Sequence, residues 1–458
     1  MKRILLPIIA VVAAFAAASA QSPDAIRKII SENTNFAIGT LTDYTNVPIG
    51  KLATPPKGYK PFYFSMVGRH GSRYELRDTT FSHTTDIFTR AAKLGILTEE
   101  GKRVHEVLLR ATAEQMGKGG ELTALGQEQW RDIGRRAYKN FPKVFDGGSV
   151  EGMSSNRLRC VFSMVAFVDG LKEKNGSIVV EQEARAITLP IIRPIIDNPA
   201  SPKEFINSRR EPRLPRVWMS DFMEWSKSFD LDRTLSKLVT NKELMLKELG
   251  ANSLFYFLYR THHLLLFSHN FGFDNKALIN SIFSLDDLYH FYCFHAIPWM
   301  YQSWGWGYAP AETFASYIEP LVDDIFDKAQ AAIDGKNPHT ANIRFTHDSY
   351  VAPLIEVFGF DGYVAKFDTN ISKAVSSAPF NKMLPMAANV QLQLYRNKEG
   401  KVLVRAMLNE ADMTLPIACD TAPFYPWEEF RKAVEGNMNR LIATREKFLP
   451  EWYRQNKK

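Results

Sequence analysis

Strand-like and helical segments alternate at both ends of this 458-residue chain, and this alternation limits the folds open to it more than any other feature. Short apolar runs bounded by turn residues predict strands, and apolar residues at helical spacing predict helices. Strands are expected at residues 61–67, 150–154, 177–183, 341–345, 390–395 and 402–408. Helices are expected at residues 83–94, 99–116, 123–141, 158–171, 349–357 and 427–448. The last two strands flank a turn and should form a hairpin, so the pattern predicts an α/β protein with a mixed central sheet flanked by helices.

The middle of the chain has a different character. Four prolines punctuate a loop that starts near residue 186, and long stretches rich in Phe, Tyr, Trp and Leu follow it. These stretches predict a mostly α-helical insertion. After a leader at residues 1–20, we expect a first core part at 21–185, the helical insertion at 186–335 and a second core part at 336–458. Both ends of the chain would then build one sheet, with the insertion as its cap.

The first twenty residues have the pattern of a secretory signal peptide. Lys2 and Arg3 precede an apolar stretch at residues 4–17, and Ala18-Ser19-Ala20 supplies the small residues before a cleavage site. The alternative is a membrane anchor, but a spanning helix needs roughly 20 apolar residues and this stretch is shorter. We expect a mature chain that begins near Gln21, is exported to the periplasm or the exterior, and has no membrane span.

Composition and charge exclude several classes of protein. Hydrophobic residues make up 45% and charged residues 23% of the chain, which excludes a disordered chain and a coiled-coil rod. The net charge is +7, or +5 once Lys2 and Arg3 are removed, and a mild positive charge suits anionic substrates. The basic residues form no run and are not interleaved with aromatic residues, so nucleic acid is not an expected partner.

The sequence gives little support for a metal or cofactor site. Three cysteines lie far apart, at Cys160, Cys293 and Cys419. They allow at most one disulfide, and buried inert thiols are favoured over metal ligands. Three histidines crowd an aromatic segment, at His262, His263 and His269. Without carboxylates or cysteines at close spacing, they favour packing or surface positions. No nucleotide fingerprint or serine-nucleophile elbow is present, and no cofactor is expected.

Two predicted strand ends carry histidine beside charged residues. Arg69-His70-Gly71-Ser72-Arg73 follows the strand at 61–67, and His347-Asp348 follows the strand at 341–345. In open α/β sheets, reactive groups collect just beyond the carboxyl ends of strands. Arginine binds phosphate oxygens bidentately, and nearby positive charge lowers the pKa of a histidine so that it stays neutral and nucleophilic. This grouping indicates chemistry on phosphate esters.

The residues predict a mechanism that needs no metal. His70 would attack phosphorus and form a phosphohistidine, while the arginines and His347 stabilise the phosphoryl oxygens. Asp348 would protonate the leaving alcohol, and this requirement favours acidic pH. Two other interpretations stay open at this point. His70 could be a strand-end histidine bound to a backbone carbonyl, and Asp348 could cap the helix that follows it.

Four segments, in this order, resemble the histidine acid phosphatases, the large-insert branch of the histidine phosphatase superfamily. The first is residues 69–73 and the last is His347-Asp348. Between them, residues 121–126 with Gln129 are similar to the family's LTxxGxxQ stretch, and residues 154–160 with Ser163, Phe167 and Gly170 resemble its arginine-bearing strand and helix. The resemblance implies an α/β phosphatase with a helical insertion.

The same resemblance implies roles for individual residues. His70 would be the nucleophile and Asp348 the proton donor. The phosphate pocket would consist of Arg69, Arg73, Arg159 and His347. Arg157 is a second candidate for the third arginine, and the family's spacing to Ser163 favours Arg159.

Within this family the chain looks most like the multiple inositol polyphosphate phosphatases, which include phytases, at residues 154–155, 159–160 and 408–410. It departs from them at His347-Asp348-Ser349, where they usually carry His-Ala-Glu and ordinary acid phosphatases carry His-Asp. Inositol polyphosphates such as phytate are therefore the expected substrates, and a broad-specificity acid phosphatase or sugar-phosphatase is the alternative. A binding protein that captures phosphate compounds without turnover is a third interpretation. The number of cationic side chains facing the pocket discriminates between the substrates.

Overall fold

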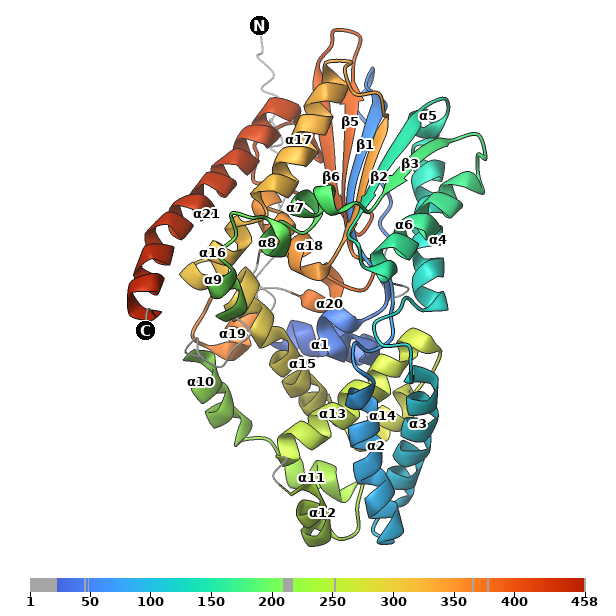
Figure 1. Ribbon diagram of the computed structural model, residues 1–458, viewed down its shortest axis with the longest axis vertical. Helices are drawn as coiled ribbons and strands as arrows, with labels where there is room; N and C mark the ends of the chain where they lie inside the picture. Colours follow the sequence, from blue (N-terminus) through green and yellow to red (C-terminus); the bar gives the residue numbers. More distant parts are fainter. Residues whose placement is uncertain are drawn as a thin grey trace, which may run out of the picture.

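A mixed sheet forms the upper half of the molecule in Figure 1. The computed structural model describes residues 23–44, 47, 49–208, 217–250, 253–364, 366–376 and 379–456, so the expected leader at residues 1–20 lies outside them. Within these residues the sheet has eight strands in the order β3-β2-β4-β1-β5-β6-β7, with β8 paired to β6. The strands are β1 (Lys60–Arg69), β2 (Ser149–Ser154), β3 (Val179–Glu183), β4 (Ala341–Thr346), β5 (Asn389–Arg396), β6 (Val402–Leu408), β7 (Ala411–Asp412) and β8 (Phe424–Pro426). The strands β3, β2, β4 and β1 run parallel and antiparallel pairing starts at β5, which confirms the predicted mixed sheet and hairpin.

Helices cover both faces of this sheet. One face is covered by α4 (Ala124–Asn140), α5 (Pro142–Phe145) and α6 (Leu158–Lys172), and the other by α17 (Glu319–Ile333), α18 (Asp348–Phe358) and α21 (Trp427–Asn456). On the first face, Trp130 of α4 packs against Phe345 of β4, with ring centroids 4.6 Å apart. On the second, Phe326 of α17 contacts Trp427 of α21. The central strands β1 and β4 are therefore buried along most of their length.

A second, helical half lies beyond the carboxyl ends of the parallel strands (Figure 1). Helices from the middle of the chain form most of it: α10 (Val217–Ser226), α11 (Leu231–Ser236), α12 (Lys242–Leu249), α13 (Leu254–Phe267), α14 (Lys276–Ile282) and α15 (Leu285–Trp299). Two helices from the first part of the chain join them, α2 (Asp78–Lys93) and α3 (Glu99–Gln115). This helical half, called the cap below, faces the edge of the sheet where His70 and His347 lie.

Shorter helices connect the two halves. They are α1 (Pro23–Glu32), η1 (Thr34–Leu41), η3 (Ala186–Thr188), α7 (Leu189–Ile192), α8 (Pro194–Asp197), α9 (Lys203–Ser208), η4 (Ser268–Phe271), η5 (Met300–Trp304), α16 (Ala309–Ser316), α19 (Ile371–Ser376) and α20 (Phe380–Met383). Every residue of η1 is buried, and this segment packs against both α15 of the cap and α20 beside the sheet.

The packing differs from the expected division of the chain in two places. Residues 21–185 were expected to form the first part of the core, and within them α2 and α3 pack on the cap, where Phe88 contacts Phe257 of α13. Residues 186–335 were expected to form the insertion, yet α17 packs on the sheet, where Asp324 pairs with Arg344 of β4. In both cases the helix packs where its apolar face is buried. Its position in the sequence does not determine which half of the molecule it joins.

The structure also shows how α4 is capped, whether the cysteines are paired and how long the apolar helices are. Thr123 caps α4, because its side chain accepts a hydrogen bond from the Gly126 N–H at 3.1 Å. All three cysteines are free, with Cys160 and Cys293 buried. No helix among the described residues is long and apolar enough to span a membrane.

The pair between Arg344 and Asp324 should be essential for stability. Arg344 is fully buried, and its Nε donates to Asp324 at 2.5 Å. Asp324→Ala would leave a buried guanidinium without its carboxylate, so we expect the free energy of unfolding to fall by about 3–5 kcal/mol. Asp327→Ala, on an exposed position of the same helix, should change it by less than about 0.5 kcal/mol. Urea unfolding followed by circular dichroism measures both, and equal stability of the two variants would contradict the prediction.

Candidate active site

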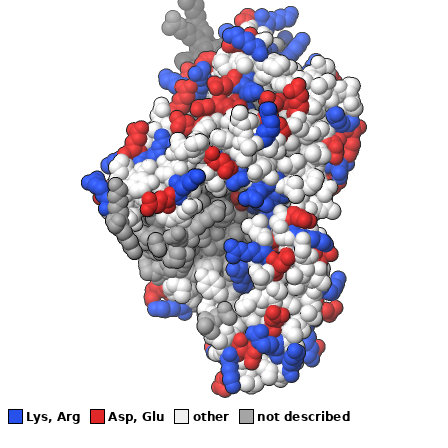
Figure 2. Space-filling view, viewed as in Figure 1, with Lys and Arg blue, Asp and Glu red and all other residues white. Residues whose placement is uncertain are grey.

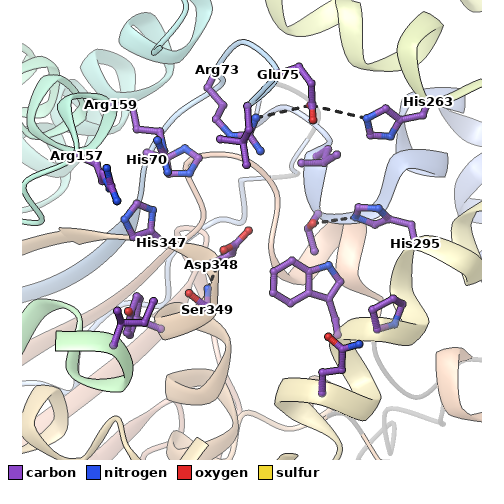
Figure 3. A pocket seen from close by; sticks show the side chains of 18 of the residues that line it. His70, Arg73, Glu75, Arg157, Arg159, His263, His295, His347, Asp348 and Ser349 are labelled. Carbon is purple, nitrogen blue, oxygen red and sulfur yellow. Dashed lines mark hydrogen bonds and ion pairs between the residues drawn. The ribbon is translucent and has the colours of Figure 1, made fainter. Parts of the chain in front are cut away.

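Three parallel strands end side by side and bring the expected site residues together. The strand β4 lies between β1 and β2, with Thr346 opposite Arg69 and Phe345 opposite Ser154. The segments that leave these strands carry His70 and Arg73, His347 and Asp348, and Arg157 and Arg159. All six of these side chains line one cavity (Figure 3). Arg69, the last residue of β1, lies fully buried beside them.

The turn that leaves β1 is held by the first turns of α4. A Cβ atom on Gly71 would lie 2.4 Å from the main-chain oxygen of Gly126, and one on Gly126 would lie 2.1 Å from that of Ser72. The N–H of Thr123 donates to the Ser72 oxygen at 2.9 Å, and Gln129 accepts from the Ser72 N–H at 2.9 Å. Residues 121–126 and Gln129, which resemble the family's LTxxGxxQ stretch, therefore position the turn that carries His70.

His70 has the environment of a neutral nucleophile. Its Nδ1 lies 3.0 Å from the main-chain oxygen of Gly71. A carbonyl oxygen only accepts, so Nδ1 carries the hydrogen and the neutral ring keeps a lone pair on Nε2. Burial, and then the positive charges of Arg159 and Arg69, lower the pKa of His70 well below its usual value of 6.5. The ring therefore stays neutral in mildly acidic solution.

His347 faces His70, with the ring centroids 5.5 Å apart. Its Nε2 lies 3.3 Å from the hydroxyl of Ser155, and the thiol of Cys160 packs behind the ring. Burial first, and then Arg159, lower the pKa of His347 to about 3. A neutral His347 can donate one hydrogen bond to a phosphoryl oxygen without adding a full charge.

Arg69 forms an ion pair with Asp348. Its Nη2 lies 2.8 Å from Oδ2 of Asp348, and its Nη1 donates to the main-chain oxygens of Thr40 and Leu384. Burial raises the pKa of Asp348, but the charge of Arg69 leads a set of opposing effects that outweigh burial and lower it. Asp348 is therefore a carboxylate in this arrangement. Although it also stands at the first position of α18, its side chain reaches Arg69 and the cavity.

Of the two candidate arginines, Arg159 has the larger electrostatic effect on the histidines. It is the charged residue with the largest influence on His70, whereas Arg157 is exposed. Its main-chain oxygen accepts from the Ser163 hydroxyl at 2.7 Å, and that hydroxyl accepts from the Gly71 N–H at 3.0 Å. Ser163 thus connects the first turn of α6 to the turn that carries His70. The buried Nε of Arg159 finds no hydrogen-bond partner among the described residues.

The cavity has a volume of about 630 Å³ and receives side chains from both halves of the molecule. Among the described residues its lining includes five arginines, Arg73, Arg157, Arg159, Arg193 and Arg260. Two carboxylates, Glu75 and Asp348, line it as well. Figure 2 shows Lys and Arg side chains gathered at the waist of the molecule, between the sheet and the cap. Positive charge therefore outweighs negative charge around the cavity.

Several cavity residues had no signal in the sequence motifs. They are Glu75, Arg193, Arg260 and His295. His263, expected in packing or at the surface, is buried and also lines the cavity, with its Nε2 3.9 Å from Glu75. His262 is buried against Phe283 and Phe291, and His269 pairs with Asp43. No three His, Cys, Asp or Glu side chains of the described chain gather as a metal site would require.

A mixed sheet whose parallel strands end in a pocket of histidines and arginines, covered by a helical cap, defines a phosphate-binding enzyme of the histidine phosphatase class. The model of the histidine phosphatase superfamily (branch 2) matches residues 63–409. The chain belongs to this family and is a phosphatase.

Solved structures share the fold. The multiple inositol polyphosphate phosphatase of Bifidobacterium longum, in complex with inositol hexasulfate, is 19% identical, with 87% of this chain and 97% of that chain covered and a TM-score of 0.67. Its apo form is 18% identical, with the same coverage and a TM-score of 0.70. The phytase from D. castellii is 13% identical, with 89% of this chain and 86% of that chain covered and a TM-score of 0.66. No curated protein matches the chain.

A substitution at Gly71 tests whether its contact with Gly126 positions the turn that carries His70. A Cβ atom on Gly71 would meet backbone that cannot move aside. We expect Gly71→Ala to displace the turn and to lower p-nitrophenyl phosphate hydrolysis by at least about 100-fold, because small misplacements of reacting groups are that costly. Gly436→Ala is the control, since a Cβ atom there meets nothing within 4 Å. Full activity of folded Gly71→Ala, checked by circular dichroism, would show that the turn tolerates the contact.

Proposed function

We propose that this phosphatase hydrolyses inositol polyphosphates, such as phytate, through a phosphohistidine at His70. The observation that carries the proposal is a neutral, buried imidazole at the edge of a cavity lined by five arginines. The imidazole supplies a nucleophile whose lowered pKa keeps it neutral in mildly acidic solution. The arginines supply more positive charge than one phosphate group requires.

In the first step, Nε2 of His70 bonds to phosphorus while the ester P–O bond on the opposite side breaks. Arg69, Arg73 and Arg159 stabilise the negative charge on the three equatorial oxygens, and His347 donates one further hydrogen bond. Asp348 gives its proton to the departing oxygen, so that the product leaves as an alcohol.

In the second step, water attacks the phosphohistidine on the side that the alcohol has left. Asp348, now a carboxylate, takes a proton from this water as the O–P bond forms and the P–N bond breaks. Inorganic phosphate leaves, and His70 returns to its neutral form with the lone pair on Nε2.

The ion pair with Arg69 explains how Asp348 could serve as an acid. With Arg69 facing it, Asp348 holds its proton weakly. A phosphate group between the two shares the positive charge of Arg69 and adds negative charge of its own, and both effects raise the pKa of a neighbouring carboxyl. The substrate thus helps to protonate the residue that will release it, and acidic pH assists in the same direction.

The substrate class follows from the arginines that are not needed at the reacting phosphorus. Arg157, Arg193 and Arg260 line the cavity in addition to Arg73 and Arg159, and Arg260 comes from the cap. A ring with several phosphate groups can occupy such a cavity, whereas a small monoester uses only part of it. The Bifidobacterium longum relative in complex with inositol hexasulfate supports a polyanionic substrate. The His347-Asp348 pair, typical of ordinary acid phosphatases, makes a broad-specificity enzyme the second candidate.

Export through the leader at residues 1–20 is part of the proposal. It rests on the sequence pattern of two cations, an apolar stretch and Ala18-Ser19-Ala20. Mass spectrometry of the protein secreted or released from its native compartment should give a mature N-terminus near Gln21. An intact leader on the active protein would remove this part of the proposal and leave the chemistry untouched.

The nucleophile and the substrate class can be tested together. We expect wild type to release phosphate from phytate with a kcat/KM at least about tenfold above that for p-nitrophenyl phosphate, since one further ion pair of about 1.4 kcal/mol suffices. His70→Ala should lower both rates by more than about 1,000-fold. His83→Ala, at an exposed position on α2, is the control and should keep full activity.

Trapping completes this test. Rapid quenching during turnover, followed by mass spectrometry, should find a phosphoryl group on His70 in wild type. Equal rates on all monoesters would favour the broad-specificity candidate. Retained hydrolysis in His70→Ala would overturn the mechanism.

A further inference from the structure

The buried segment η1 reaches the site from the side of the cap. Its residue Thr40 has no exposed surface, and its main-chain oxygen accepts a hydrogen bond from Nη1 of Arg69. The hydroxyl of the same residue lies 3.1 Å from Nε2 of His295, which belongs to α15 of the cap (Figure 3). Thr40 therefore connects a cap histidine to the arginine beneath the cavity.

Arg69 depends on this connection for its orientation. Both hydrogens of Nη1 are used by main-chain oxygens, one from Thr40 and one from Leu384 at 2.9 Å. With Nη1 fixed in this way, the planar guanidinium directs Nη2 toward Asp348 at 2.8 Å. A shift of the Thr40 carbonyl would therefore rotate the guanidinium relative to the carboxyl that it faces.

The backbone before Thr40 has an unusual conformation that places it against His295. Gly39 has φ +55° and ψ −121°, a combination that is open to glycine but strained for other residues. A Cβ atom on Gly39 would lie 2.7 Å from Cδ2 of His295. The close approach and the hydrogen bond from Thr40 together fix η1 against α15 at this point. Burial lowers the pKa of His295 to about 3, so its ring takes part as a neutral partner.

We propose that Thr40 and His295 are positioning residues for the proton transfer to the leaving group, acting through Arg69 on Asp348. The inference rests on the proposed function, because it assumes that Asp348 is the proton donor. It assigns to the cap a role in the chemical step, in addition to any contact with the substrate.

Substrates with different leaving groups distinguish this positioning role from a merely structural one. p-Nitrophenolate is a weak base and departs without a proton, whereas the alkoxide of an alkyl phosphate needs one as it leaves. Asp348 also acts in the second step, which both substrates share, so the comparison uses kcat/KM, which reports only the steps up to departure of the leaving group. A variant that misplaces Asp348 therefore loses kcat/KM on the alkyl ester and keeps it on the aryl ester. A variant that merely loosens the fold loses kcat/KM on both.

The test compares Thr40→Val, Thr40→Ser and His295→Leu on glycerol phosphate and p-nitrophenyl phosphate. Valine keeps the shape of threonine and removes the hydroxyl, while serine keeps the hydroxyl. We expect Thr40→Val to lower kcat/KM for glycerol phosphate about tenfold, a part of the roughly 100-fold or more that a proton donor contributes. Its kcat/KM for p-nitrophenyl phosphate should stay within about twofold of wild type, and Thr40→Ser should restore the wild-type kcat/KM on glycerol phosphate.

The His295→Leu variant, which cannot form this hydrogen bond, keeps the inference testable if Thr40→Val does not fold. It should show the same selective loss of kcat/KM, and in the double variant the two effects should not add, because both remove the same hydrogen bond. Equal losses of kcat/KM on the two substrates, or no change, would each overturn the inference.

Asp348→Asn distinguishes failure of the inference from failure of the proposed function. If this variant shows the selective loss of kcat/KM on glycerol phosphate and the Thr40 and His295 variants do not, the inference alone fails. If Asp348→Asn lowers kcat/KM equally on both substrates, Asp348 is not the proton donor, and the proposed mechanism and the inference fail together.

Discussion

The buried positive charge of Arg69 organises the whole site. A guanidinium without exposed surface needs partners, since an unpaired buried ion costs several kcal/mol. The carbonyls of Thr40 and Leu384 and the carboxylate of Asp348 supply them. These partners come from η1, from the segment between α20 and β5, and from the end of β4, so three distant parts of the chain must meet around one side chain. Burial, with the charges of Arg159 and Arg69, lowers the pKa of His70, and the charge of Arg69 leads the effects that outweigh burial and lower the pKa of Asp348.

The site residues at the carboxyl ends of the parallel strands could be predicted from the sequence, because they follow predicted strands in short, distinctive runs. Arg69, His70 and Arg73 lie within five positions, and His347-Asp348 follows a strand whose apolar pattern is clear. The β1 and β4 pairing then brings both runs together through backbone geometry alone. Residues 121–126 were recognised by resemblance, but only the packing of Gly126 on the turn explains their role.

The cap side of the cavity could not be predicted in the same way. Arg260 lies on a helix whose other residues are mostly apolar, and Arg193 lies between two short helices in a proline-rich loop. An arginine in such a setting looks the same in sequence whether it faces solvent or a ligand. The two local exceptions to the expected division into core and insertion have a related cause. The helices α2 and α3 carry apolar faces that fit either half, and only the tertiary packing decides between them.

The position of β4 between β1 and β2 has a consequence for the newly made polypeptide. Ribosomes produce β1 and β2 long before β4, yet neither earlier strand touches the other in the finished sheet. Such late, long-range strand insertion is slow compared with the formation of local helices. Asp348 follows β4 in the chain, so Arg69 gains this carboxylate only after β4 has been made and has inserted between the two earlier strands.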